Sequence, residues 1–110
     1  MRDNRAILLP VSTASDPRPY AAIGDRLRQL RIAHGKSQSE VAPALGIKQP
    51  TYNAYETGRR LMPVEHVLLL RKLYRTARGY NVTLDFIYTG DHGGLEVRLL
   101  DALRNKRALP

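Results

Sequence analysis

Two short helical segments that meet at a glycine constrain the fold of this chain more than any other feature of its sequence. Ser37 is a good N-cap, and Glu40 three residues later completes a capping box that fixes where the first segment begins. Gly46 ends this segment, and Gly58 ends the second, which has a proline in its first turn. Only a few residues separate the two helices, so residues 37–57 are predicted to form a closely crossing helix pair.

Such a pair is typical of the helix-turn-helix motif. It requires a small residue where the helices meet, which is Gly46 or the nearby Ala42 and Ala44, and an apolar plug at the corner, which is Ile47. It also requires a second helix whose outer side can contact a partner. Pro43 removes one backbone donor near the end of the first helix, so we expect a distorted last turn there.

Four further amphipathic segments accompany this pair. The first spans about residues 21–34, the second begins after Pro63, the third is capped by Thr83 and stopped by Gly90, and the last covers residues 95–103. The buried stripe of the first consists of Ile23, Leu27 and Leu30. The second has a wide apolar surface that we expect to be mostly core, formed by Val64, Val67, Leu68, Leu69, Leu70, Leu73 and Tyr74.

The sequence therefore predicts an all-α protein in three parts. Residues 1–19 form an N-terminal arm with an apolar stretch at 6–11, residues 20–90 form a five-helix domain, and residues 91–110 form a flexible link and a short C-terminal helix.

Charge and composition narrow the classes of function. The chain of 110 residues has 18 basic and 10 acidic residues, a formal net charge of +8, which favours a polyanionic partner such as nucleic acid. It has no cysteine, its three histidines lack ligand spacing, and no catalytic or phosphate-loop motif is present, so we expect no metal, no cofactor and no enzyme. No apolar run is long enough for a membrane span or a signal peptide, so a cytoplasmic location is expected. Arg26 and Arg28 are expected to face away from the core, and a solvated basic face is expected at Arg71, Lys72, Arg75 and Arg78.

Four ordered segments resemble a known family, the phage-repressor and Cro-type (Xre-like) helix-turn-helix domains. Residues 23–31 (IGDRLRQLR) resemble its opening helix, and residues 37–42 (SQSEVA) its Ser-Gln start of the second helix. Residues 55–60 (YETGRR), followed by Pro63, resemble its aromatic-Glu ending of the third helix, and residues 82–90 (VTLDFIYTG) its fifth helix. The resemblance covers residues 22–90 and implies a lambda-repressor-like fold.

The resemblance also implies which residues contact double-stranded DNA. Gln49 is implied as the leading base reader, because its amide matches the donor and acceptor of adenine in the major groove. Pro50, Asn53 and Ala54 share its side of the helix, whereas Tyr52 and Tyr55 are expected in the core. Gln38 is implied to bridge a phosphate and the first recognition residue. Backbone donors near Gly58 are implied to hold phosphates, together with the side chains of Lys48, Thr51, Arg59 and Arg60.

A buried ion pair between Arg31 and Glu56, linking the first and third helices, is the remaining implied feature. The chain departs from the family pattern at Lys48, where a serine-like N-cap is usual, and at Tyr52, where an aliphatic residue is usual. The link over residues 74–81 is also longer than usual. Pro50 and Ala54 leave few hydrogen-bonding readers, so sequence specificity is expected to be modest or to rest on DNA shape.

These observations predict a sequence-specific transcriptional regulator, a repressor, that binds DNA as a homodimer. The tail leucines (Leu95, Leu99, Leu103), the exposed parts of the fifth helix and the apolar arm are candidates for the dimer contact. The alternative is an antitoxin or another protein-interaction module on the same fold, whose arm or tail binds a protein partner. The apolar content of residues 6–11 and 95–103 exceeds what DNA binding needs and is what distinguishes this alternative.

Overall fold

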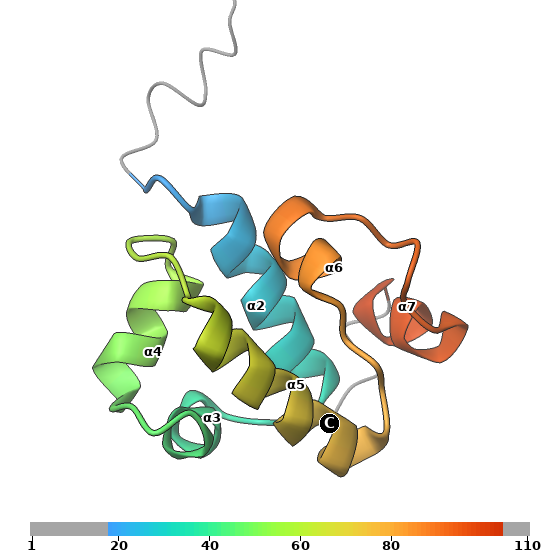
Figure 1. Ribbon diagram of the computed structural model, residues 1–110, viewed down its shortest axis with the longest axis horizontal. Helices are drawn as coiled ribbons and strands as arrows, with labels where there is room; N and C mark the ends of the chain where they lie inside the picture. The colour runs from blue at the N-terminus through green and yellow to red at the C-terminus, as the bar shows by residue number, and fades with distance from the viewer. Residues whose placement is uncertain (1–17, 105–110) are drawn as a thin grey trace, which may run out of the picture.

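The computed structural model describes residues 18–104, and over this range the protein is built from helices without a β-strand (Figure 1). This confirms the predicted all-α fold, with five helices before residue 90 and a sixth in the tail. The apolar residues 6–11 of the expected arm lie outside the described range. The helices are α2 (Ala21–Ala33), α3 (Gln38–Ala44), α4 (Gln49–Glu56), α5 (Val64–Arg78), α6 (Leu84–Thr89) and α7 (Val97–Arg104).

The start of α3 has the local chemistry that its sequence indicates. The Ser37 hydroxyl accepts from the backbone N–H of Glu40 at 3.2 Å, and the Ser37 N–H donates to the Glu40 carboxylate at 2.8 Å. This closes the predicted capping box. At the other end, Leu45 N–H donates to the Ala42 carbonyl and Gly46 N–H to the Pro43 carbonyl, each three residues back. With the Ile47 N–H donating to the Ala42 carbonyl, they form a glycine C-cap at Gly46. The same pattern ends α2 and α4, so these bonds do not show the distortion expected from Pro43.

The turn between α3 and α4 depends on Gly46 for its backbone angle, not for its small size. Gly46 has a φ of +72°, which is unfavourable for other residues, yet a Cβ added to it would meet nothing within 4 Å. The small residue buried next to the turn is Ala42, whereas Ala44 is exposed. Of the three residues that the sequence left open for the helix crossing, Ala42 is therefore the one that fills it.

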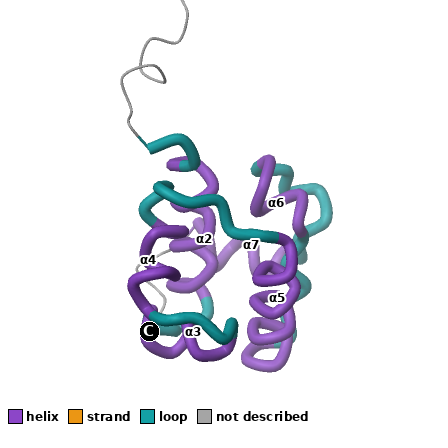
Figure 2. The backbone as a smooth tube through the Cα atoms, turned by 60° about the vertical axis from the view of Figure 1, so that its left-hand side comes forward, coloured by secondary structure: helices purple, strands orange, loops and turns teal. Residues whose placement is uncertain are grey.

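The central helix α2 packs against α4, α6 and α7. Leu27, Leu30 and Ala33 are fully buried, and Ile23 is partly buried against the same core. A Cβ on Gly24 would lie 2.3 Å from the Glu56 carbonyl oxygen, so only glycine lets α2 approach the end of α4 this closely. This contact fixes the position of α4 relative to the rest of the domain. In the view of Figure 2, α4 lies on one side of the molecule and α5 on the other.

The tail packs onto its own domain. Leu95, Leu99 and Leu103 are 8%, 0% and 9% exposed, and α7 contacts α2. The prediction that these leucines make a dimer contact is therefore wrong, because the amphipathic face of α7 is already covered. On α6, Phe86 and Ile87 are buried, whereas the exposed part of the helix, Asp85 and Thr89, stays a candidate for the dimer contact. Most of the apolar content of residues 95–103 is thus explained by the core, and Val97, which is 71% exposed, is the exception.

The link before α7 is held by local contacts, although the sequence predicted a flexible segment. The Gly93 N–H donates to the Asp91 carboxylate at 2.9 Å, and the Leu95 N–H donates to the His92 carbonyl at 3.0 Å. The His92 ring lies 5.7 Å from the ring of Phe86. These contacts lead the chain back toward α2.

The apolar surface of α5 is only partly core. Val67, Leu70 and Tyr74 are fully buried, whereas Leu68 and Leu69 are 48% and 42% exposed. The prediction that this surface is mostly core is therefore wrong. A helix that is apolar around most of its circumference needs cover on two sides, and within the described residues α5 is covered on one.

Two arginines that were expected to be solvated are bonded to backbone carbonyls. Arg26 Nε donates to the Ile87 carbonyl at 2.9 Å and so ties α2 to α6. Arg71 Nε donates to the Val82 carbonyl at 2.5 Å and ties α5 to the segment before α6. The longer link after Tyr74 is therefore taken up by α5 itself, which continues to Arg78, and by a short loop pinned through Arg71.

Candidate nucleic-acid interface

The short helix α4 has a buried inner side and an exposed outer side. Tyr52, Tyr55 and Glu56 are 0%, 3% and 6% exposed, which confirms that both tyrosines belong to the core. On the outer side, Gln49, Pro50 and Asn53 are exposed and Ala54 is half-buried. The structure thus brings the four residues predicted to read bases together on one uncharged surface.

The inner side is organised around the Glu56 carboxylate. Arg31 donates from Nε to Oε2 at 2.6 Å and from Nη2 to Oε1 at 3.1 Å, a bidentate ion pair between α2 and α4. The Tyr52 hydroxyl donates to Oε2 at 2.6 Å, and Gln38 Nε2 donates to Oε1 at 3.1 Å. Four donors therefore surround a carboxylate whose side chain is 3% exposed, and they come from α2, α3 and α4.

The cluster shifts the pKa values of two of its members. The hydrogen-bonded Glu56 carboxylate raises the pKa of the Arg31 guanidinium above its ordinary value. Burial raises the pKa of the Tyr52 hydroxyl, which stays protonated and donates. Arg31 Nη1 also donates to the Lys36 carbonyl at 2.9 Å, so the same guanidinium fixes the loop before α3. The cluster therefore fixes the orientation of α4 relative to α2 and α3.

Gln38 takes a partner other than the one that the resemblance implies. Its amide Nε2 donates to the Asn53 Oδ1 at 3.1 Å as well as to Glu56, and no bond to Gln49 occurs among the described residues. Both amide hydrogens are thus engaged, and a phosphate oxygen can only accept. Gln38 therefore orients Asn53, the second candidate reader, rather than Gln49.

The residues predicted to hold phosphates lie at both ends of α4. Lys48 is the exposed N-cap and Thr51 is half-buried in the first turn, while Arg59 and Arg60 are exposed just after the last turn. The backbone donors expected at Gly58 are engaged, because the N–H groups of residues 58–60 donate to the carbonyls of Tyr55 and Ala54. The expectation that these donors are open to phosphates is therefore wrong. The side chains of Lys48, Thr51, Arg59 and Arg60 remain as candidate phosphate ligands.

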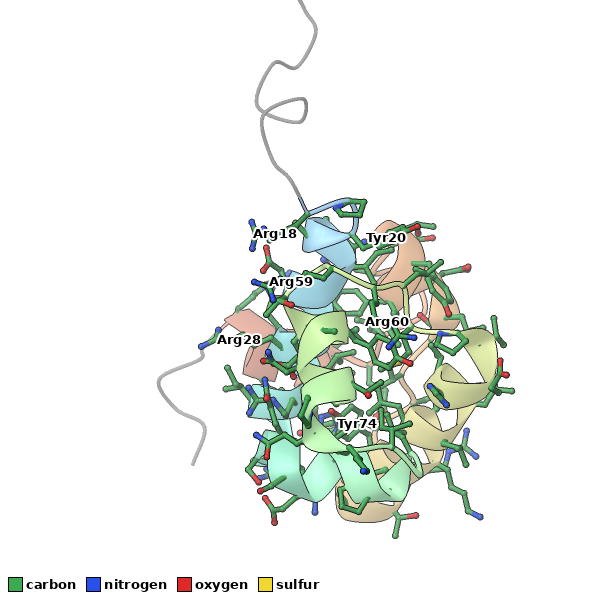
Figure 3. The ribbon with its side chains drawn as sticks, turned by 90° about the vertical axis from the view of Figure 1, so that its left-hand side faces the viewer. Arg18, Tyr20, Arg28, Arg59, Arg60 and Tyr74 are labelled. Carbon is green, nitrogen blue, oxygen red and sulfur yellow. The ribbon has the colours of Figure 1, made fainter. Side chains whose placement is uncertain are left out.

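Two further arginines, one before α2 and one on it, accompany this surface. Figure 3 looks onto α4 and shows Arg18 and Arg28 on the same side of the helix as Arg59, with Arg60 on the other side. Arg28 is exposed on α2. The Tyr20 N–H donates to the Gly58 carbonyl at 2.9 Å, and this backbone bond brings the start of α2 next to the end of α4. No short-range signal in the sequence could have predicted this backbone bond.

Within residues 18–104, no helix is long and apolar enough to cross a membrane. Over the same range, no group of three or more histidine, aspartate or glutamate side chains is placed to hold a metal ion.

The fold and this interface place the chain in a known class. A model of the helix-turn-helix domain family matches residues 22–79, and the chain belongs to this family. It is 34% identical over 62 residues to YobD, an uncharacterised HTH-type transcriptional regulator of Bacillus subtilis (strain 168). The match covers 56% of this chain and 50% of the relative, so the chain spans about half the length of the curated relative it matches. A comparison with solved structures gave no match.

These comparisons confirm the Xre-like helix-turn-helix domain that the sequence indicates.

Proposed function

We propose that the protein is a cytoplasmic, sequence-specific repressor that inserts α4 into the major groove of DNA and binds as a dimer. The observation that carries the proposal is the outer side of α4, where exposed Gln49 and Asn53 lie between cationic residues at both ends of the helix. An amide side chain reads adenine through one donor and one acceptor, while the flanking cations neutralise phosphates.

The rigid inner side supports this role. Base reading requires side chains held at a fixed distance from the groove, and α4 is tied to α2 and α3 through the Glu56 carboxylate. Asn53 is further restrained by its 3.1 Å bond to Gln38. Gln49 therefore reads the first base from a fixed helix, and the Gln38–Asn53 pair presents a second, pre-oriented amide.

Selection of binding sites from random DNA at a stated salt concentration tests base reading directly. Gln49→Ala is expected to cost about 1–3 kcal/mol of discrimination at one base position while leaving binding to random DNA unchanged. Arg59→Ala is expected to weaken binding to all sequences and to lower the salt slope by about one. Arg78→Ala, at the far end of α5, is the matched control. An equal loss on selected and random DNA for Gln49→Ala would show that this residue reads no base.

The selected sites also test the dimer and the repressor role. A two-fold dimer reads two half-sites about 34 Å apart, one turn of DNA, so the sites should be palindromes with that spacing. A single unpaired half-site would contradict dimeric binding. A reporter with the selected site inside its promoter should lose transcription when the protein is supplied, and increased transcription would instead identify an activator.

A further inference from the structure

Four of the five large hydrophobic side chains that are exposed among the described residues lie on α5 or just before it. Leu61, Val64, Leu68 and Leu69 are 44%, 50%, 48% and 42% exposed, and they follow one another from just before the helix into its second turn. A groove of about 290 Å³ beside Leu69 extends this surface onto α3, since it is lined by Ala44 and Leu73 as well. A contiguous patch of this kind on a small domain usually marks an interaction site.

The charges around this surface are arranged symmetrically. Glu65 and Lys72 are seven residues apart, close to two helical turns, so both project from the same outward side of α5. Leu68 and Leu69 lie midway between them. Both charged residues are exposed, and neither forms an ion pair with any residue in the range 18–104.

We propose that the outer side of α5 binds a second copy of this chain, with the two α5 helices antiparallel around a two-fold axis between Leu68 and Leu69. That axis brings Glu65 opposite Lys72 of the partner subunit and Lys72 opposite Glu65 of the partner subunit. The leucines of both copies meet at the centre. A closed two-fold contact requires a surface that is complementary to itself. The outer side of α5 meets this requirement, because its acidic, apolar and basic residues follow one another in that order.

Neighbouring charges are compatible with this pairing. Arg71 and Arg75 both donate from Nη2 to the Asn81 Oδ1, at 3.2 and 3.4 Å, and are drawn toward the loop after α5. Because α4 and α5 lie on different sides of the molecule, a copy bound at α5 leaves α4 uncovered (Figure 2). This contact between α5 helices rests on the dimer proposed above, and it can be tested without DNA.

Charge reversal tests the pairing in the full chain by sedimentation over a wide concentration range. E65K and K72E each turn two attractive pairs into repulsive ones, so each variant should dimerise roughly tenfold more weakly than the wild type. An equimolar mixture of the two variants should form a heterodimer, because both pairs become attractive again. The double variant E65K/K72E should recover dimerisation for the same reason.

An apolar variant tests the centre of the contact. L68S/L69S should sediment as a monomer that keeps the helical circular dichroism spectrum of the wild type, since both side chains are already half exposed. V97S is the matched control, because Val97 is 71% exposed on α7 and lies on another helix. A wild-type monomer at every concentration, a dimer that survives L68S/L69S, or a mixture that fails to restore dimerisation would each overturn the proposal. A monomer that still selects one DNA sequence would leave the role of α4 intact.

Discussion

The inner and outer sides of α4 are built from the same eight residues and have opposite chemistry. On the inner side, a buried carboxylate with four donors joins three helices. On the outer side, amide and small side chains are exposed, and the bond between Gln38 and Asn53 is the one hydrogen bond between two side chains there among the described residues. Stability and recognition are thus separated within one short helix. Substitutions on one side should leave the property of the other side almost unchanged.

Removal of the central carboxylate should have the largest effect. Glu56→Ala leaves Arg31 without its partner in a site where the guanidinium is only 15% exposed, and we expect a loss of about 3–5 kcal/mol in the free energy of unfolding. Urea denaturation followed by circular dichroism measures it. Gln49→Ala on the outer side is the control and should change stability by less than about 0.5 kcal/mol. Similar losses for the two variants would contradict the separation of the two sides.

A smaller effect is expected when one donor is removed. Tyr52→Phe deletes the hydroxyl that donates to Glu56 Oε2 at 2.6 Å while it keeps the buried ring. A hydrogen bond to a charged group contributes about 1.5–3 kcal/mol, so the free energy of unfolding should fall by that amount. In the Glu56→Ala background the same substitution should cost much less, because the acceptor is gone. Additive losses in this double-mutant cycle would show that the hydroxyl acts elsewhere.

Stability should also fall in mild acid because of a histidine at the end of α2. The His34 ring is buried, stacks on Tyr74 at 4.0 Å and donates from Nδ1 to the Leu30 carbonyl at 2.6 Å. Burial lowers the pKa of His34 below its ordinary value, and nearby Arg78 and Lys36 add to this effect. In mild acid, His34 therefore binds a proton more readily in the unfolded chain than in the folded chain.

The sign of this pH dependence follows from proton binding. Stability is fully present above the unfolded pKa of about 6.5 and is lost as the pH falls through the lowered folded pKa, with a slope of at most about 1.4 kcal/mol per pH unit. Urea denaturation between pH 5.5 and pH 8, where carboxylates stay ionised, measures the slope. His34→Phe keeps a stacked ring and should flatten it. An equal slope in wild type and variant would assign the dependence to another group.

Local signals in the sequence were enough to predict the helix pair and most of α4. The Ser37 capping box and the glycine stops act over three or four residues, so they can be recognised without knowledge of the fold. The two faces of α4 follow from helical periodicity alone. The same reasoning failed where one apolar face could pack in two ways: the leucines of α7 are buried, whereas Leu68 and Leu69 of α5 are exposed. Periodicity tells which residues share a face, but not which face another helix covers.

The N-cap of α4 is the position where the requirements of the two sides meet, and the smallest effect is expected there. Lys48 has the extended backbone of an N-cap, with φ −84° and ψ 156°, but its side chain makes no capping hydrogen bond. A serine in this conformation can accept from a free N–H in the first turn, so Lys48→Ser should raise the free energy of unfolding by about 0.5–1 kcal/mol.

The same substitution removes a cation at the edge of the outer side. If Lys48 contacts one phosphate, Lys48→Ser should weaken DNA binding and lower the salt slope by about 0.9. Lys48→Ala separates the two effects, because it removes the charge without adding a cap: its salt slope should match that of Lys48→Ser, and its stability should not rise. Wild-type DNA affinity and slope in both variants would mean that the family's usual cap was lost here for a reason other than DNA. If Lys48→Ser gains stability and loses DNA affinity, Lys48 favours DNA binding at the expense of helix stability.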